Sequence, residues 1–422
     1  MSSLPPGPEL PPLVQTVAFH REPLGVLRRA RARHGPLFTL RLSVAGPTVV
    51  AASAGAASVL LEADPDRAHA GEARRRLLPM ASPRSSFGGD GEAHRAARRR
   101  IAPAFEPDVL ARRQDALAAL AAEHAPRWPR GRPFRVLPRV RTLIDDVFIR
   151  HVLGVDDERL AGPLRTALRR MLNSPGNPPV PLPGEGNDTL AGPAGALFAW
   201  RKAPVEKLLA EAIDARRARP GGDDVIGALV CSAPELATDA MVDELLPVVM
   251  AAQEPPSVAV TWLLDRAGRS EDAREALLAG GDAADRVVRE TLRLQPPALA
   301  VLRRTTAPVE VPGGTIPAGS TTIVPIPLLH RDASAFPDPE RFDPARWGSG
   351  RADEAAYLPF GGGARRCIGE PLAHAYLGAL VPAMLRRVRL RAVLPEPERM
   401  VLRGTILVPH RSALVRARRF GA

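Results

Sequence analysis

The feature that most constrains the fold is a glycine-rich loop that leads through a cysteine into an amphipathic helix. Residues 360–380 read FGGGARRCIGEPLAHAYLGAL. Glycines let a backbone turn tightly and approach a bulky flat ligand closely. A cysteine just before a helix start lies at the positive end of the helix dipole, which lowers a thiol pKa and favours the metal-binding thiolate. Taken alone, Cys367 is equally compatible with a small buried cysteine in a loop.

Composition places this loop in an ordinary globular chain of 422 residues, 45% of them hydrophobic and 25% charged. No apolar run is long enough to span a membrane, and the proline-rich lead-in over residues 1–12 lacks the pattern of a secretory signal. We therefore expect a cytoplasmic protein. Two cysteines are too few for a disulfide framework. We interpret Cys231, which has no special setting, as a core residue.

The net charge of +12 raises a remote alternative, a basic nucleic-acid-binding protein without enzyme activity. Lysine occurs only at 202 and 207, so nearly all of the 58 basic residues are arginines, and they are spread along the whole chain. Aromatic residues make up 4%, which leaves few platforms for stacking bases. This pattern favours solvated helix faces, and no nucleic-acid partner is expected.

The periodicity of apolar residues predicts a mainly α fold with small β-sheets. No repeat of fixed period and no linker between two cores is found, so we expect a single large domain over residues 1–422. The expected elements are strands at 37–42 and 47–52, helices at 107–125 and 203–219 within a largely helical stretch from about 55 to 300, a loop at 174–195, β-prone pieces at 309–327, a helix at 370–388 and a closing strand pair at 405–417.

The complete spacing Phe-Gly-x-Gly-x-Arg-x-Cys-x-Gly over residues 360–369 resembles the heme-binding loop of the cytochrome P450 family, the heme-thiolate monooxygenases. Two other motifs agree with this resemblance. RETLRLQPP holds Glu290 and Arg293 three apart on one helix face, and FPDPERFDPARW supplies a second basic residue, Arg341. In the family, these positions form a buried Glu–Arg–Arg cluster that holds the core beside the heme. The resemblance covers essentially the whole chain and implies the cytochrome P450 fold.

The resemblance also implies a heme b cofactor, with Cys367 as its iron ligand. Heme carries two propionates, so the site needs several cations. EAHRAARRRIAPAF (92–105) matches the family's His-x-x-x-Arg helix, and Arg304 is a possible substitute for Arg303. The implied cofactor-binding residues are His94, Arg98, Arg303, Phe360, Gly361, Arg365, Cys367 and Gly369.

The stretch VVMAAQEPPSVAVTWLL (248–264) falls on the family's central distal helix. The family pattern is Ala/Gly-Gly-x-Asp/Glu-Thr, whereas this chain has AAQEP, so Pro255 stands where the threonine is expected. Glu254 is the candidate for proton delivery. Two adjacent prolines remove the donors for the carbonyls of Ala251 and Ala252 and predict a kink. Those carbonyls could hold water or a substrate donor; a kink that serves only packing is the alternative.

The resemblance implies a bacterial enzyme that inserts oxygen from O2 into a small or medium apolar substrate, with secondary metabolism as its setting. Because Pro255 replaces threonine, atypical chemistry at the same heme stays open as an alternative: peroxide-driven oxidation, oxidative coupling or ring formation. The chain has no dinucleotide-binding fingerprint, so a separate ferredoxin or flavodoxin with its reductase is expected. Arg95, Arg99 and Arg366 are candidates to steer that partner. We expect a monomer. Specificity is expected in the segments 80–90, 174–195 and 296–302.

Overall fold

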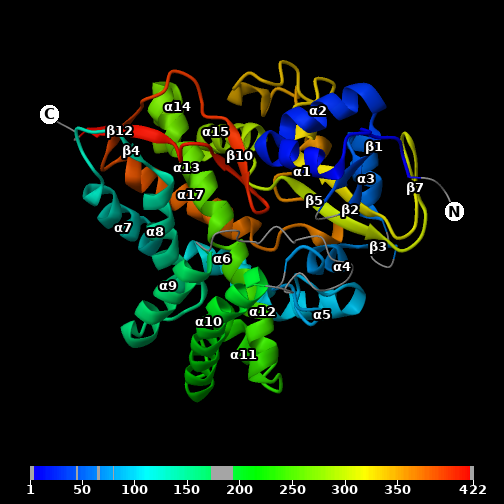
Figure 1. Cartoon of the computed structure of the whole chain (residues 1–422). Helices are drawn as coiled ribbons and strands as arrows, with labels where there is room; N and C mark the ends of the chain where they lie inside the picture. Colours follow the sequence, from blue (N-terminus) through cyan, green and yellow to red (C-terminus); the bar gives the residue numbers. More distant parts are fainter. Residues whose placement is uncertain (1–3, 44–45, 64–66, 79, 173–192, 419–422) are drawn as a thin grey trace.

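Helices surround a long central helical axis, and a twisted sheet lies to one side of them (Figure 1). The computed structural model describes the chain except for residues 1–3, 44–45, 64–66, 79, 173–192 and 419–422. The helices are α1 (Pro12–Arg21), α2 (Pro23–His34), α3 (Ala54–Glu62), α4 (Ala70–Arg75), α5 (Gly91–Ile101), α6 (Pro107–Ala111), α7 (Gln114–His124), α8 (Leu137–Val147), α9 (Glu158–Leu172), α10 (Pro193–Ala218), α11 (Val225–Ser232), α12 (Thr238–Ala251), α13 (Glu254–Arg269), α14 (Glu271–Ala279), α15 (Gly281–Leu294), α16 (Ile326–Leu329) and α17 (Glu370–Leu385). The strands are β1 (Leu37–Leu42), β2 (Gly46–Ala51), β3 (Ala68–His69), β4 (Phe134–Arg135), β5 (Ala300–Thr305), β6 (Val309–Val311), β7 (Gly314–Ile316), β8 (Thr321–Pro325), β9 (Arg389–Ala392), β10 (Met400–Arg403), β11 (Ile406–Pro409) and β12 (Leu414–Arg418).

The main hydrophobic core lies among the helices. It joins the apolar faces of α7, α8, α9, α10, α12, α13 and α17, where leucine, valine and alanine recur three and four residues apart. Burial of these faces is the chief source of stability for helices of this length. Within the described residues, no helix combines the length and apolar character that crossing a bilayer would need.

A five-stranded sheet in the order β1-β2-β8-β5-β3 lies beside the N-terminal helices, at the right of Figure 1. Alternate residues of a strand point to opposite faces. On β5, Arg303 is therefore buried while its neighbour Arg304 is only half-buried. The sheet brings β5 against α4, which places Arg303 of β5 close enough to Arg74 of α4 for the two charges to repel each other.

Most elements expected from the sequence are present, with two differences. The helix expected at 107–125 is divided into α6 and α7. The expected pairing of the last two strands is wrong, because β11 pairs with β10 and β12 pairs with β4 and β9. Ser412 and Ala413 adopt φ angles of 66° and 55°, and this turn sends the chain into a different sheet. Of the loop expected at 174–195, residues 173–192 lie outside the described part and α10 begins at Pro193.

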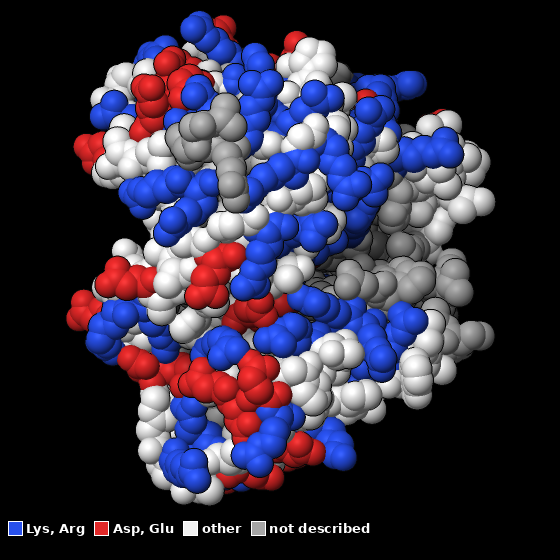
Figure 2. All heavy atoms as spheres, turned by 90° about the vertical axis from the view of Figure 1, so that its left-hand side faces the viewer, with Lys and Arg blue, Asp and Glu red and all other residues white. Residues whose placement is uncertain are grey.

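Arginines cover the outer face of the small sheet β4–β12–β9. Arg416 lies opposite Arg391, and Arg418 lies opposite Arg389, all four with exposed side chains. Like charges directly opposite each other slightly destabilise a sheet. Figure 2 shows this side of the molecule: basic side chains predominate over its upper half, where an acidic cluster lies at the upper left, and larger acidic clusters lie among the basic side chains below. The mixture below agrees with solvated helix faces.

Candidate active site

Cys367 lies at the end of a tight loop that is closed by backbone contacts. Its N–H donates to the carbonyl of Phe360 over 2.9 Å, and α17 begins three residues later. Gly361 and Gly363 adopt φ angles of 69° and 62°, which L-residues with a side chain rarely adopt. A Cβ on Gly363 would lie 2.0 Å from the Leu61 carbonyl oxygen. Glycine is therefore required at 363 both by conformation and by space.

The Cys367 side chain is exposed, yet the protein around the sulfur removes most of its hydration. This desolvation raises the pKa of the thiol, and it outweighs the N–H of Gly369 and the positive charges of Arg98 and Arg74, all of which lower it. The pKa lowering predicted from the helix dipole is thus wrong for the free thiol. The predicted backbone donor is present. Binding of a metal ion would displace the thiol proton.

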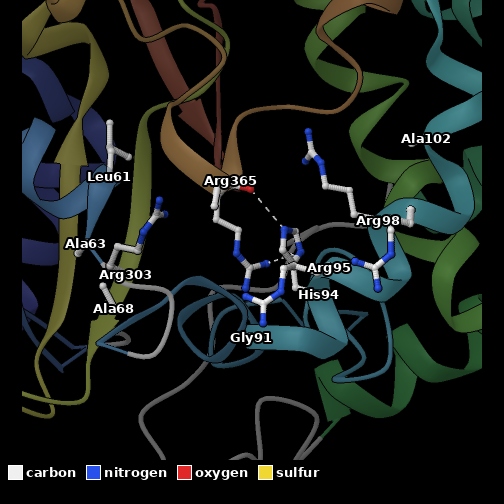
Figure 3. A pocket seen from close by; sticks show the side chains of 12 residues that line it. Leu61, Ala63, Ala68, Gly91, His94, Arg95, Arg98, Ala102, Arg303 and Arg365 are labelled. Atoms are coloured by element: carbon white, nitrogen blue, oxygen red, sulfur yellow. Dashed lines mark hydrogen bonds between the residues drawn. The ribbon is translucent and has the colours of Figure 1, made fainter.

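A cavity of about 310 Å³ opens beside this loop (Figure 3). It is lined by Leu61, Ala63, Ala68, Gly91, His94, Arg95, Arg98, Arg99, Ala102, Arg303, Ala364 and Arg365. His94 and Arg98 come from α5, Arg303 comes from β5 and Arg365 comes from the cysteine loop. The structure therefore gathers the four side chains that the sequence motifs singled out. Burial, followed by repulsion from Arg365, lowers the pKa of His94, so the positive charge at neutral pH comes from the three arginines. Arg304 instead forms an ion pair with Glu72 at 2.8 Å, so Arg303 is the cavity residue.

The positive charge that lines this cavity is only partly balanced by carboxylates outside the lining: Arg365 pairs with Asp90 at 2.6 Å, and Arg95 and Arg99 pair with Glu92 at 2.8 Å. The described residues that line it include five arginines and a histidine but no aspartate or glutamate. Arg303 is 3% exposed and, within the described part of the chain, donates to the Leu302 carbonyl but pairs with no carboxylate. Burial, followed by repulsion from Arg365, lowers the pKa of Arg303 to about 10, so it stays charged at neutral pH. The cavity is suited to a dianionic group.

Arg74 of α4 belongs to the same cationic group, although the sequence motifs did not identify it. Burial, followed by repulsion from Arg303 and Arg365, lowers its pKa to about 9. Its guanidinium donates to the Phe87 carbonyl at 3.1 Å and lies over the Phe87 ring. No motif surrounds Arg74 in the sequence, and only the packing of α4 against β5 brings it to the site.

The helix on the other side of the core is interrupted at the two prolines. α12 ends at Ala251 and α13 begins at Glu254. Pro255 and Pro256 therefore stand in the first turn of α13, where a backbone N–H would have no intrahelical acceptor. At the predicted kink the α-helical pattern is interrupted at Ala252 and Gln253, although both residues stay in the right-handed helical region. Between the helices, the carboxamide of Gln253 is 3% exposed, and neither of its polar atoms has a partner among the described residues.

Comparison with known proteins identifies this arrangement. A family model described as cytochrome P450 matches residues 282–415. The cytochrome P450 135B1 of Mycobacterium tuberculosis is 33% identical over 433 residues, which cover 98% of this chain and 91% of that protein. The chain belongs to the cytochrome P450 family. The cytochrome P450 138 of Mycobacterium bovis is 28% identical over 439 residues, with 99% and 96% of the two chains covered.

Solved structures support the same fold for this P450. Retinoic acid-bound cyanobacterial CYP120A1 superposes with a TM-score of 0.83 at 22% identity, covering 99% of this chain and all of that one. CYP109Q5 from Chondromyces apiculatus gives a TM-score of 0.77 at 22% identity, with 97% and 98% covered. The predicted fold class, mainly α with small sheets in the cytochrome P450 fold, is confirmed. The protein is a P450 monooxygenase, and the non-enzymatic nucleic-acid-binding alternative is wrong.

The residues present fit the heme iron that this family implies. Cys367 offers a thiol in a loop whose glycines allow a close approach, and Arg303 and Arg98, which have no carboxylate partner among the described residues, suit the propionates. Phe360 packs half-buried against the helical core, and its ring lies 5.4 Å from that of His374. Gly369 precedes α17 directly and donates to the cysteine sulfur.

The predicted buried cluster of one glutamate and two arginines is present in this P450, but one of the two arginines is a different residue from the one predicted. Both oxygens of Glu290 accept from Arg293, at 2.8 and 2.9 Å. The second arginine on Glu290 is Arg346, at 3.1 Å, whereas Arg341 has an exposed side chain and contributes its carbonyl to Arg293. Trp347 also donates to Glu290, at 3.1 Å. The chain contains Pro-x-Arg-aromatic twice in nine residues, and the second copy carries the buried arginine.

Glu254 is held in an ion pair at the start of α13. Its carboxylate accepts from Nε of Arg141 at 2.9 Å and from a second nitrogen of the same guanidinium. Both side chains are partly exposed, at 25% for Arg141 and 29% for Glu254. A fork-to-fork contact of this kind fixes the carboxylate in place. Proton delivery from Glu254 would require this contact to loosen.

Other expectations are altered by the structure. Cys231 is exposed on α11, so its interpretation as a core residue is wrong. Arg95 and Arg99 both pair with Glu92, at 2.8 Å. Arg366 pairs with Glu370 at 2.6 Å. These local pairs compensate part of the positive charge that was expected to steer a redox partner.

Proposed function

We propose that this P450 inserts one oxygen atom from O2 into a small or medium apolar organic molecule in bacterial secondary metabolism. The observation that carries the proposal is the placement of Cys367 in a glycine-shaped loop beside an arginine-lined cavity, in which Arg98 and Arg303 have no carboxylate partner among the described residues. We assign heme b as the cofactor, with Cys367 as the iron ligand. When bound, thiolate-ligated heme iron supplies the centre that activates dioxygen.

The cations of the cavity are proposed to hold the two propionates. His94, Arg98, Arg303 and Arg365 are the residues matched to the family, and Arg74 adds a further charge beside them. Their mutual repulsion would be relieved by two carboxylates, so cofactor binding would stabilise the fold as well as the site. Phe360, Gly361 and Gly369 would form the rest of the cofactor's bed.

Around the helix break, the proposed roles concern protons and polar groups. The carbonyls of Ala251 and Ala252 have no i+4 donor because residues 255 and 256 are prolines. They can accept hydrogen bonds from water or from a polar group of the substrate. Glu254 is the proposed proton source, and exchange with solvent would follow release of its carboxylate from Arg141.

A second candidate function rests on Pro255 itself. A proline offers no hydroxyl at the position where the family has threonine, so peroxide-driven oxidation, oxidative coupling or ring formation is the alternative chemistry. Pro255→Thr separates the two, with Pro256→Ala as the control for a changed helix start. If coupling of O2 consumption to product rises sharply in Pro255→Thr only, the native enzyme is not tuned for ordinary monooxygenation. If turnover falls, the proline serves the native mechanism.

The expected partners follow from the chain's composition and charge. An apolar substrate suits the buried Val248, Val249 and Ala252 near the break. Electrons are proposed to come from a separate ferredoxin or flavodoxin with its reductase. We further propose that the protein is a cytoplasmic monomer with a single domain.

The first experiment is the visible spectrum of the dithionite-reduced protein with and without carbon monoxide. The expected result is the red-shifted Soret band of thiolate-ligated heme, and its loss in Cys367→Ser. Cys231→Ser is the matched control, because it removes the chain's other thiol and should leave the band unchanged. A protein without heme from heme-replete cells, or a band that survives in Cys367→Ser, would overturn the assignment.

A further inference from the structure

The segment formed by residues 80–90 is tied to the cationic cavity through its backbone. Four successive carbonyls, from residue 86 to residue 89, each accept from a basic side chain. Ser86 O accepts from Arg365 at 3.5 Å and lies 2.7 Å from Nδ1 of His94. Phe87 O accepts from Arg74, Gly88 O from Arg75, and Gly89 O from Arg365. Two of the proposed cofactor-binding residues, His94 and Arg365, therefore contact this segment, and Arg365 also pairs with Asp90 at the end of the segment, at 2.6 Å.

The same segment is tied to α12 by carboxylates. Asp243 accepts from Ser82 at 2.8 Å and from Arg84 at 2.6 Å. Asp239 accepts from Arg84 at 3.2 Å. The two ion pairs of Arg84 are at the surface and are correspondingly weak. The segment thus bridges the cavity and the central helix.

The third carboxylate, Glu244, differs because it is buried. It is 1% exposed and accepts from the Ser86 N–H at 2.7 Å and from the Ser86 hydroxyl. Glu244 shares a helix face with Val248 and Ala251, four and seven residues on, so the segment covers the face that continues to the helix break. Ser86 therefore connects Glu244 on one side to His94 and Arg365 on the other.

The environment of Glu244 moves the pH range over which its carboxyl ionises to near neutrality. Burial raises the pKa of Glu244 to about 7, against the lowering effect of the two Ser86 donors. The charged groups that act on it are Arg100 of α5, which lowers the pKa, and the adjacent Asp243, which raises it. The carboxyl is therefore protonated below neutrality and carries a poorly hydrated charge above it.

We propose that Glu244 is a positioning residue that latches the 80–90 segment onto α12 and, through Ser86, holds His94 and Arg365 in place for the heme propionates. The latch weakens as the carboxyl ionises, because opening returns the charge to water. This inference rests on the proposed heme-binding function of the cavity.

The direction and size of the pH effect on opening of the segment follow from the linkage between ionisation of Glu244 and opening. Glu244 favours the closed segment most below the ordinary pKa of 4.5, and this preference is lost as pH rises through about 7. If opening hydrates the carboxyl fully, the open population rises about tenfold more between pH 6 and pH 8 than it would without this group. Loss of heme from the holoenzyme should accelerate by the same factor.

The test is the rate of heme transfer from the holoenzyme to excess apomyoglobin at pH 6 and pH 8. Glu244→Gln keeps one acceptor and one donor for Ser86 but cannot ionise, so it should lose the pH dependence and retain heme longer than the wild type at pH 8. Glu244→Ala should release heme faster than the wild type at pH 6, because both contacts to Ser86 are gone. Glu235→Gln, which changes an exposed glutamate just before α12, is the matched control and should keep the wild-type ratio.

Two results would overturn the inference. One is a heme-loaded Glu244→Gln with the same pH ratio as the wild type. The other, which applies if Glu244→Gln does not fold, is a heme-loaded Ser86→Ala whose transfer rates match the wild type at both pH values. Failure of the wild type to bind heme at all would instead refute the proposed function, so the two failures are distinguishable.

Discussion

Arg346 should be the second arginine on which the buried cluster depends, and its replacement provides a demanding test. Arg346 is 1% exposed and donates to Glu290 at 3.1 Å and to the Pro337 carbonyl at 2.7 Å. Arg346→Met would leave Glu290 fully buried with Arg293 as its remaining cation. Removing one partner from a buried ion pair typically costs about 3–5 kcal/mol.

The decrease in the free energy of unfolding for Arg346→Met should lie near the lower limit of this range, about 3 kcal/mol, because Arg293 still donates twice to Glu290. The orphaned Pro337 carbonyl contributes to this loss. The free energy of unfolding should be measured in guanidinium on the holoenzyme, followed by tryptophan fluorescence.

Arg341→Met is the matched control, since it makes the same chemical change five residues earlier. The Arg341 side chain is exposed and its carbonyl, which the variant keeps, is the group that contacts Arg293. The expected change is within about 0.5 kcal/mol. Equal destabilisation by the two variants, or a larger loss in Arg341→Met, would refute the assignment of Arg346 to the cluster.

Three further changes have defined outcomes. Gly363→Ala should lower the heme content of the purified protein, because the new Cβ would meet the Leu61 carbonyl at 2.0 Å, whereas Gly362→Ala meets only a leucine methyl group at 3.1 Å and should bind heme normally. Gln253→Leu should raise the free energy of unfolding by about 1–3 kcal/mol, since its buried carboxamide has no partner among the described residues; Gln295→Leu, which removes an acceptor of Arg266, should give no such gain. Glu244→Gln should stabilise the fold by about 3 kcal/mol at pH 8 and by little at pH 4, because the raised pKa of the wild-type carboxyl means stability is lost as pH rises from 4.5 through about 7. Equal effects at both pH values would contradict that pKa.

The sequence was informative where function requires a fixed local pattern. The cysteine loop could be predicted because each glycine in it answers a backbone requirement that few other residues meet. The interruption of the central helix could also be predicted, since two adjacent prolines cannot continue the hydrogen-bond ladder. The local sequence did not predict that the prolines begin a new helix or that Glu254 pairs with Arg141. The ion pair depends on where α8, which carries Arg141, packs against α13.

Elsewhere, tertiary packing decided what sequence could not. Arg341 and Arg346 occupy equivalent positions in two copies of one short pattern, and only the course of the backbone shows which of them is buried. Arg74 has no motif around it, and Cys231 lies on a short helix whose apolar neighbours gave a misleading impression of burial. The latch at Glu244 joins residues 158 positions apart in the chain, a separation that local patterns do not report.

Because the carbonyls of residues 86–89 are held by contacts, the positions of the 80–90 segment differ in how well they tolerate substitution. A Cβ on Gly88 would lie 2.4 Å from the Ser82 carbonyl oxygen, and one on Gly89 would lie 2.9 Å from that of Pro83. Pro83 and Arg84, by contrast, are exposed. Libraries that aim to change substrate preference should therefore randomise Pro83 and Arg84 and spare both the buried Met80 and Ala81 and the second half of the 80–90 segment. Diversity in the second half would chiefly yield proteins without cofactor, and screening effort would be lost on them.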